Sequence, residues 1–72
     1  MSVQLATKKI LFRDLKPGDI TVLDGETDTV KSVRYGDGLV SFEGQTAKPV
    51  VVVFESGKQI KHHPGNRIAI AR

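Results

Sequence analysis

Short apolar runs alternate with tight-turn signals along this chain of 72 residues. The runs are rich in Val, Ile, Thr and Phe, which fit the pleated, half-buried surface of a β-strand. Pro-Gly, Asp-Gly, Glu-Gly and Ser-Gly pairs separate them at intervals that leave little space for helices. The pattern therefore predicts an all-β fold, with extended segments at residues 9–13, 19–23, 27–35, 39–43, 50–54, 58–61 and 67–71.

The segment 27–35 is long for a strand in so small a protein. Its apolar residues Val30 and Val33 are three positions apart, whereas side chains on one face of a strand repeat every two. A β-bulge near Lys31 and Ser32 would shift the register by one residue and turn both valines inward. We therefore predict a bend at this point, which lets a short sheet fold over on itself.

The segment 50–54 reads Val-Val-Val-Val-Phe and is the most apolar in the chain. A strand with one solvated face should carry polar residues on that face, and this one has none. Its second face would then be covered, either by residues 3–6 or by a second copy across a symmetric contact. The alternative is an ordinary strand with two exposed valines. Val51 and Val53 are thus the candidate interface residues.

The length of the chain fits one domain, 1–72, in which residues 1–8 form a flexible arm or an arm that covers a strand. A chain this short hides only about 60% of the surface that it exposes when unfolded. The absence of cysteine excludes disulfides and thiolate metal sites, and it fits a reducing compartment. No apolar run approaches the roughly 18 residues of a membrane span, and the start lacks the charge order of a signal peptide. We expect a cytoplasmic protein with no membrane partner.

Groups that support catalysis or metal binding are scarce in the sequence. Adjacent residues on a strand point to opposite faces, so His62 and His63 are poorly placed to share a metal ion. The three carboxylates of residues 24–28 lack the ligand spacing of a calcium loop, and residues 36–38 lack the Lys-Ser/Thr of a phosphate-binding loop. We expect a protein that is not an enzyme, with no metal site and no cofactor.

Positive charge is concentrated in the C-terminal part of the chain. Residues 44–72 carry five Lys and Arg against one acidic residue, whereas residues 1–43 carry six against seven. A hairpin with cations along one edge can follow a phosphate backbone, and an exposed Tyr35 could stack on a base. The candidate nucleic-acid-binding residues are Arg34, Tyr35, Lys58, Lys61, His62, His63 and Arg67.

The order of turns in residues 15–43 resembles the opening of SH3-like small barrels of the KOW or Tudor type. The resemblance rests on the LKPGD sequence at 15–19, the Asp-Gly pair at 24–25 and the TVKSV sequence at 29–33. It implies a small barrel of five or six strongly bent antiparallel strands. Such modules bind RNA, DNA or protein through loops and a basic edge.

Two functions from different classes follow from these features. The favoured one is a binding module for the DNA or RNA backbone that uses the basic C-terminal hairpin and loop, with an affinity that falls as salt rises. The alternative is a protein-interaction or self-assembly module, of the kind that phages and mobile elements encode, which uses the Val51 and Val53 face or an open sheet edge. Its partner would be a second copy or another protein. A third and weaker option is an accessory domain of a larger machine.

Overall fold

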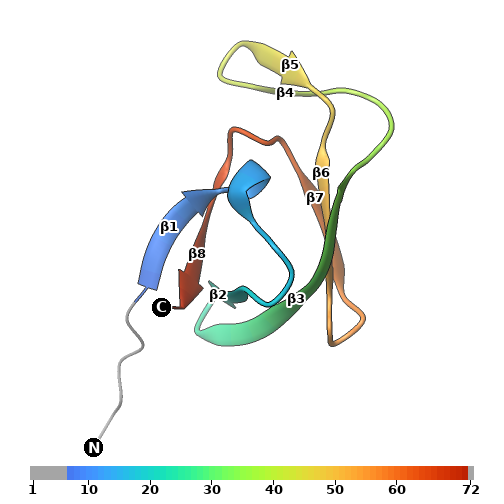
Figure 1. Ribbon diagram of the computed structural model, residues 1–72. Helices are drawn as coiled ribbons and strands as arrows, with labels where there is room; N and C mark the ends of the chain where they lie inside the picture. The colour runs from blue at the N-terminus through green and yellow to red at the C-terminus, as the bar shows by residue number, and fades with distance from the viewer. Residues whose placement is uncertain (1–6, 72) are drawn as a thin grey trace, which may run out of the picture.

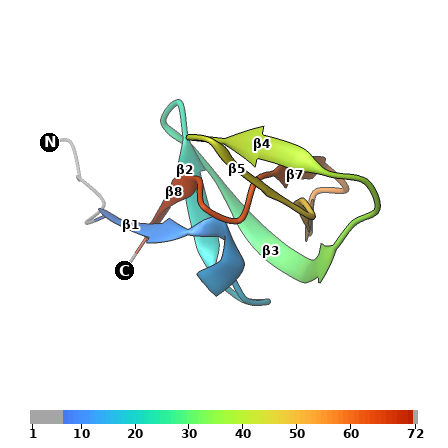
Figure 2. The same cartoon turned by 90° about the horizontal axis from the view of Figure 1, so that it is seen from above.

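The computed structural model describes residues 7–71, which form eight strands and one 3-10 helix (Figures 1 and 2). No α-helix occurs in this part of the chain, so the prediction of an all-β fold is confirmed. The elements are β1 (Thr7–Leu11), the 3-10 helix η1 (Phe12–Asp14), β2 (Ile20–Leu23), β3 (Glu26–Tyr35), β4 (Val40–Phe42), β5 (Gln45–Ala47), β6 (Val50–Phe54), β7 (Gln59–His62) and β8 (Arg67–Ala71).

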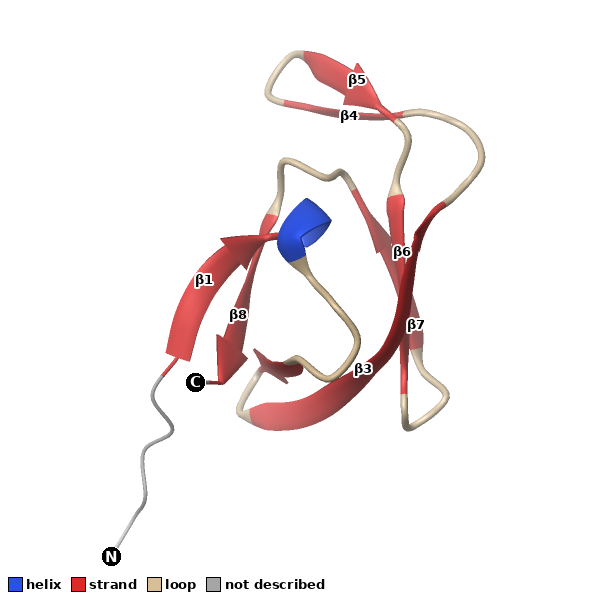
Figure 3. Cartoon of the chain, viewed as in Figure 1, coloured by secondary structure: helices blue, strands red, loops and turns tan. Residues whose placement is uncertain are grey.

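Six strands form one antiparallel sheet in the order β1-β8-β2-β3-β6-β7, while β4 and β5 form a separate hairpin. The sheet curls, so that β1 and β8 stand opposite β6 and β7 with η1 between them (Figures 1 and 3). The two strands at the ends of the order, β1 and β7, do not pair with each other within residues 7–71. The sheet is therefore open, and the predicted closure into a barrel is not observed.

A β-bulge in β3 produces the curl. The first half of β3 pairs with β2 and the second half with β6, and the register with β6 shifts between Val30 and Ser32. Lys31 is the extra residue, so the predicted bulge is confirmed. Val30 is fully buried and Val33 packs partly buried against the core. A bulge bends a strand and increases its twist, and this bend lets β3 serve both halves of the sheet.

The core fills the inside of the curl. It gathers three residues from β6 and one each from β3, β8, η1 and the segment after η1, which explains how so short a chain completes a buried cluster. Four partly buried side chains, Ile10, Val33, Ile60 and Ile70, pack around it. The buried members are Phe12, Leu15, Val30, Val50, Val52, Phe54 and Ile68.

Strand β6 is covered on both faces, as its sequence predicts. Val52, on the inner face, is fully buried, and Val51, on the opposite face, is only 3% exposed. The cover over Val51 includes the backbone at Gly36, where a Cβ would lie 2.8 Å from Val51 Cγ2. Val53, on the same face as Val51, is half-buried. This chain therefore buries Val51 without a second copy.

Four further observations bear on the predictions made from the sequence. Phe12 and Arg13, predicted within the first strand, belong to η1, and β5 occupies a segment for which no strand was predicted. Of the predicted arm, residues 1–6, including the proposed cover at 3–6, lie outside the described residues, while Thr7 and Lys8 begin β1. Within residues 7–71, no helix has the length and apolar character needed to cross a lipid bilayer.

Candidate nucleic-acid interface

Two predicted phosphate-binding cations share one face of the sheet. Arg34 of β3 is the cross-strand partner of Val51, and Val51 is in turn the partner of Lys61 of β7. Partners directly opposite each other project from the same side of a sheet. Adjacent strands are about 4.8 Å apart, which places the backbones of Arg34 and Lys61 about 10 Å from each other. Both side chains are exposed, on either side of the buried Val51.

A second row of residues extends this surface. Val53 pairs with Ser32 on one side and with Gln59 on the other. Alternation along each strand puts this row on the same side as Val51. None of the six positions carries a carboxylate. We call this surface the outer face; it consists of Ser32, Arg34, Val51, Val53, Gln59 and Lys61.

Tyr35 and His62 lie in the next row, which alternates to the inner side. Both are cross-strand partners of the buried Val50. The His62 ring stacks on Phe12, with ring centroids 4.8 Å apart and an interplanar angle of 28°. Tyr35 ends β3 and is 60% exposed. Arg34 and Tyr35 therefore project from opposite sides of β3 and do not form one joint platform.

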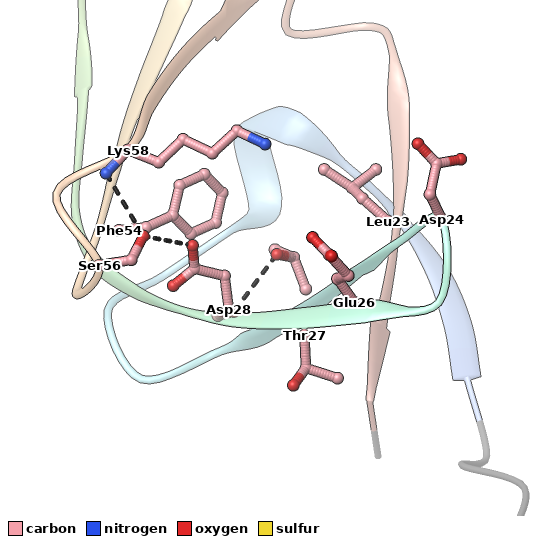
Figure 4. A pocket seen from close by; sticks show the side chains of 9 residues that line it. Leu23, Asp24, Glu26, Thr27, Asp28, Phe54, Ser56 and Lys58 are labelled. Atoms are coloured by element: carbon pink, nitrogen blue, oxygen red, sulfur yellow. Dashed lines mark hydrogen bonds between the residues drawn. The ribbon is translucent and has the colours of Figure 1, made fainter.

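Lys58 lies among acidic residues. It follows the β6-β7 turn and lines a hollow of about 460 Å³ together with Asp24, Glu26 and Asp28 of the β2-β3 hairpin (Figure 4). Ser56 Oγ donates a hydrogen bond of 2.6 Å to Asp28 Oδ2 and receives one of 3.4 Å from the backbone N–H of Lys58. This linkage extends the pairing of β3 with β6 beyond Phe54 and holds the β6-β7 turn against the β2-β3 hairpin. The carboxylates oppose phosphate binding at Lys58.

His63 lies inside the molecule. It is only 5% exposed, and its ring lies 5.8 Å from that of Phe42 in β4, centroid to centroid. Its Nδ1 accepts a hydrogen bond of 2.9 Å from the backbone N–H of Gly65, while Nε2 is buried without a partner in the structure. The neighbouring cation Arg67 begins β8 and lines a different hollow with His62. His63 and Arg67 are thus both separate from the outer face.

Of the seven predicted residues, the structure brings Arg34 and Lys61 together on the outer face. The other five lie elsewhere, at separate places in the fold. Sequence reasoning missed the polar neighbours Ser32 and Gln59 on the outer face. The position of Gln59 could have been predicted, because Ile60 faces inward and its neighbours in β7 therefore face outward. The position of Ser32 depends on the bulge at Lys31, because the bulge determines which face each later residue of β3 occupies.

Among residues 7–71, no three His, Asp or Glu side chains gather closely enough to hold a metal ion. Comparisons of the chain with protein-family models, with curated proteins and with solved structures found no match.

Proposed function

We propose that this chain is a non-catalytic module that contacts the phosphate backbone of DNA or RNA through its outer face. The observation that carries the proposal is the row Arg34, Val51 and Lys61, in which a buried valine holds two exposed cations on one side of a rigid three-stranded region. Strand pairing fixes the backbones of these cations, so phosphate binding has to restrict only their side chains. The contact gives weak, sequence-independent binding, because phosphates carry no base identity.

Two further features support this function. The turn sequence at residues 15–19 resembles that of SH3-like barrels, so a relationship to that group of binding modules forms part of the proposal. The outer face also lacks carboxylates at its six positions, which distinguishes it from the hollow around Lys58. The absence of cysteine supports a place in the reducing cytoplasm.

Self-assembly through Val51 and Val53 has less support. Val51 is only 3% exposed in the single chain, so it offers little surface to a second copy. Val53 alone is half-buried, and one such side chain is a small part of the roughly 800 Å² that each partner of a stable complex buries.

Salt-dependent oligonucleotide binding tests the proposed function. Labelled single-stranded and double-stranded oligonucleotides are titrated by fluorescence anisotropy at a series of salt concentrations. Two phosphate contacts predict a slope of log K against log salt of about −1.8 on duplex and about −1.4 on single strands. The double variant Arg34→Gln with Lys61→Gln should abolish most of the binding and bring the slope close to zero.

A matched control removes two cations elsewhere. Lys8 and Lys9 of β1 are exposed and lie on the opposite side of the curl from β6 and β7. Lys8→Gln with Lys9→Gln has the same net charge as the outer-face variant and should keep the affinity within about twofold. Equal losses in both variants would show unspecific attraction to a basic protein, and no binding by the wild type would refute the function.

A further inference from the structure

The curled sheet is open along the side where β7 stands opposite β2 and β8. Two hollows lie along this opening. One is the hollow of about 460 Å³ around Lys58, and the other, of about 280 Å³, lies between β7 and β8. Leu23 lines both hollows and is 40% exposed, so the hollows adjoin at this residue, and we call the two together the seam. Apolar side chains from five elements line it: Phe12, Leu23, Phe54, Ile60 and Ile68.

The backbone of β7 faces outward beside the seam with unused hydrogen-bonding groups. Phe54 N–H donates a hydrogen bond of 2.8 Å to the carbonyl oxygen of Lys58, in register with the β6-β7 ladder. Hydrogen-bonded pairs alternate in an antiparallel ladder, so Ile60 and His62 bond to β6. The N–H and C=O groups of Gln59 and Lys61 therefore point away from β6. No strand within residues 7–71 pairs with that edge.

Charge is distributed unevenly along the seam. Asp24, Glu26 and Asp28 line the end next to the β2-β3 turn, and Arg67 lines the other end beside His62. A segment that is complementary to the seam carries a basic residue at the first end, an acidic residue at the second, and apolar residues between them. This pattern also runs along β7, because the β6-β7 turn lies at the acidic end and His62 at the basic end.

A second copy of the chain fits this edge poorly. The other free edge of the sheet is β1, which carries the exposed Lys8 and Lys9. Pairing β1 of one copy with β7 of another would set these lysines beside Lys61, and pairing two β7 edges would set Lys61 near itself. Like charges at close cross-strand positions are destabilising, so the charges favour a different chain.

We propose that the seam binds an extended segment of a partner protein, which adds to β7 as a further strand. Its backbone pairs with the outward N–H and C=O groups of Gln59 and Lys61, and its apolar residues, at alternate positions, cover Leu23 and Ile60. Main-chain bonds supply affinity in this mode of recognition, and the side-chain pockets supply specificity. The proposal uses the edge of the sheet and is independent of nucleic-acid binding on the outer face.

The test uses a synthetic peptide of about ten residues in which valines alternate with polar residues, with two glutamates near the N-terminus and two lysines near the C-terminus. This order suits antiparallel pairing with β7. Amide hydrogen exchange of the full chain, followed by NMR, should show at least tenfold slower exchange at Gln59 and Lys61 when the peptide is saturating. The amides of Ile60 and His62 should change less, because β6 already binds them.

Two variants separate strand addition from other kinds of binding. Gln59→Pro removes an outward N–H without breaking a bond to β6, and edge strands tolerate proline. It should weaken the peptide at least tenfold, whereas Gln59→Thr, which keeps the N–H, should bind within about twofold of the wild type. Leu23→Ser should also weaken the peptide while leaving oligonucleotide affinity unchanged. A urea unfolding curve for each variant checks that the variant is still folded.

Four results would overturn the proposal. One is unchanged exchange at Gln59 and Lys61 in the presence of the peptide. Another is equal affinity for a peptide of the same composition with its valines placed side by side. A third is protection of these two amides in concentrated protein alone, with a matching rise in mass by sedimentation, which would make a second copy the occupant. The fourth is protection of the same amides by an oligonucleotide.

Discussion

His63 accepts a hydrogen bond at Nδ1 from the backbone N–H of Gly65, two residues further along the chain, over 2.9 Å. Because Nδ1 accepts, the proton of the neutral ring lies on Nε2, which is buried without a partner in the structure. The ring also packs beside Phe42 of the β4-β5 hairpin. One side chain thus shapes the turn between β7 and β8 and supports the hairpin above it.

Replacement of His63 tests this arrangement. His63→Phe keeps an aromatic ring but leaves the N–H of Gly65 without its acceptor. The substitution also removes the unpartnered Nε2–H, which offsets part of this loss, so we expect the free energy of unfolding to fall by about 1 kcal/mol. His62→Phe is the matched control, because His62 is exposed and its ring stacking on Phe12 is retained. It should change stability by at most about 0.5 kcal/mol in urea unfolding. Equal effects at both positions would contradict the assigned role.

The close approach of Gly36 to Val51 supports a second prediction. A Cβ at Gly36 would lie 2.8 Å from Val51 Cγ2, so Gly36→Ala forces a movement and should lower stability by about 1–3 kcal/mol. Val51→Ala removes the opposing methyl groups. In the double variant the added methyl occupies that space, so its loss should be smaller than the sum of the single losses by at least about 0.5 kcal/mol. Additive losses in thermal unfolding would show that the two residues do not interact.

The two faces of β6 should differ in their sensitivity to truncation. Val52 is completely buried in the core, whereas Val53 is half-buried on the outer face. Val52→Ala removes two packed methyl groups and leaves a cavity, with an expected loss of about 2–3 kcal/mol. Val53→Ala should lose about 1 kcal/mol or less. Urea unfolding measures both, and the opposite order would contradict the assignment of faces.

The bulge at Lys31 can be removed by deleting this one residue. Val30 and Val33 would then be two positions apart and could face inward on a straight strand. The bend that brings β6 and β7 opposite β1 and β8 would be lost. We expect the deletion to lower the free energy of unfolding by at least about 2 kcal/mol. Lys31→Ala, which keeps the extra residue, should cost no more than about 0.5 kcal/mol. A deletion variant as stable as the wild type would show that the bend is dispensable.

Much of the fold follows from local pattern. The β-branched runs predict the bounds of β6 and β8 as observed, and the valine spacing in β3 predicts its bulge. Strand β5 could not be predicted in this way, because Gln45 and Thr46 are exposed and give it no apolar face; the pairing with β4 defines it. Phe12 fits the apolar pattern of the preceding strand, but its carbonyl oxygen accepts the hydrogen bond from Leu15 N–H that closes η1, and the apolar pattern does not reveal that turn.

The candidate site was harder to predict because it depends on register. Arg34 and Lys61 are far apart in sequence and meet through their shared partner Val51. The cluster of charge in the C-terminal third suggested a single surface, but a tight turn buries His63 and the hairpins carry Lys58 to the acidic end of the seam. The surface on which each charged residue lies can be predicted only when the strand pairing is known.

The hairpin formed by β4 and β5 has no strand pairing with the main sheet within residues 7–71. Just below it, Gly36 N–H donates a hydrogen bond of 2.8 Å to the carbonyl oxygen of Pro49, so the two ends of the intervening segment are held together at its base. The positions between them form a natural grafting point. A longer loop, a reporter peptide or a recognition sequence inserted among the exposed residues 37–39 would keep Phe42 against His63 and leave the six-stranded frame unchanged, which makes this small protein a display scaffold.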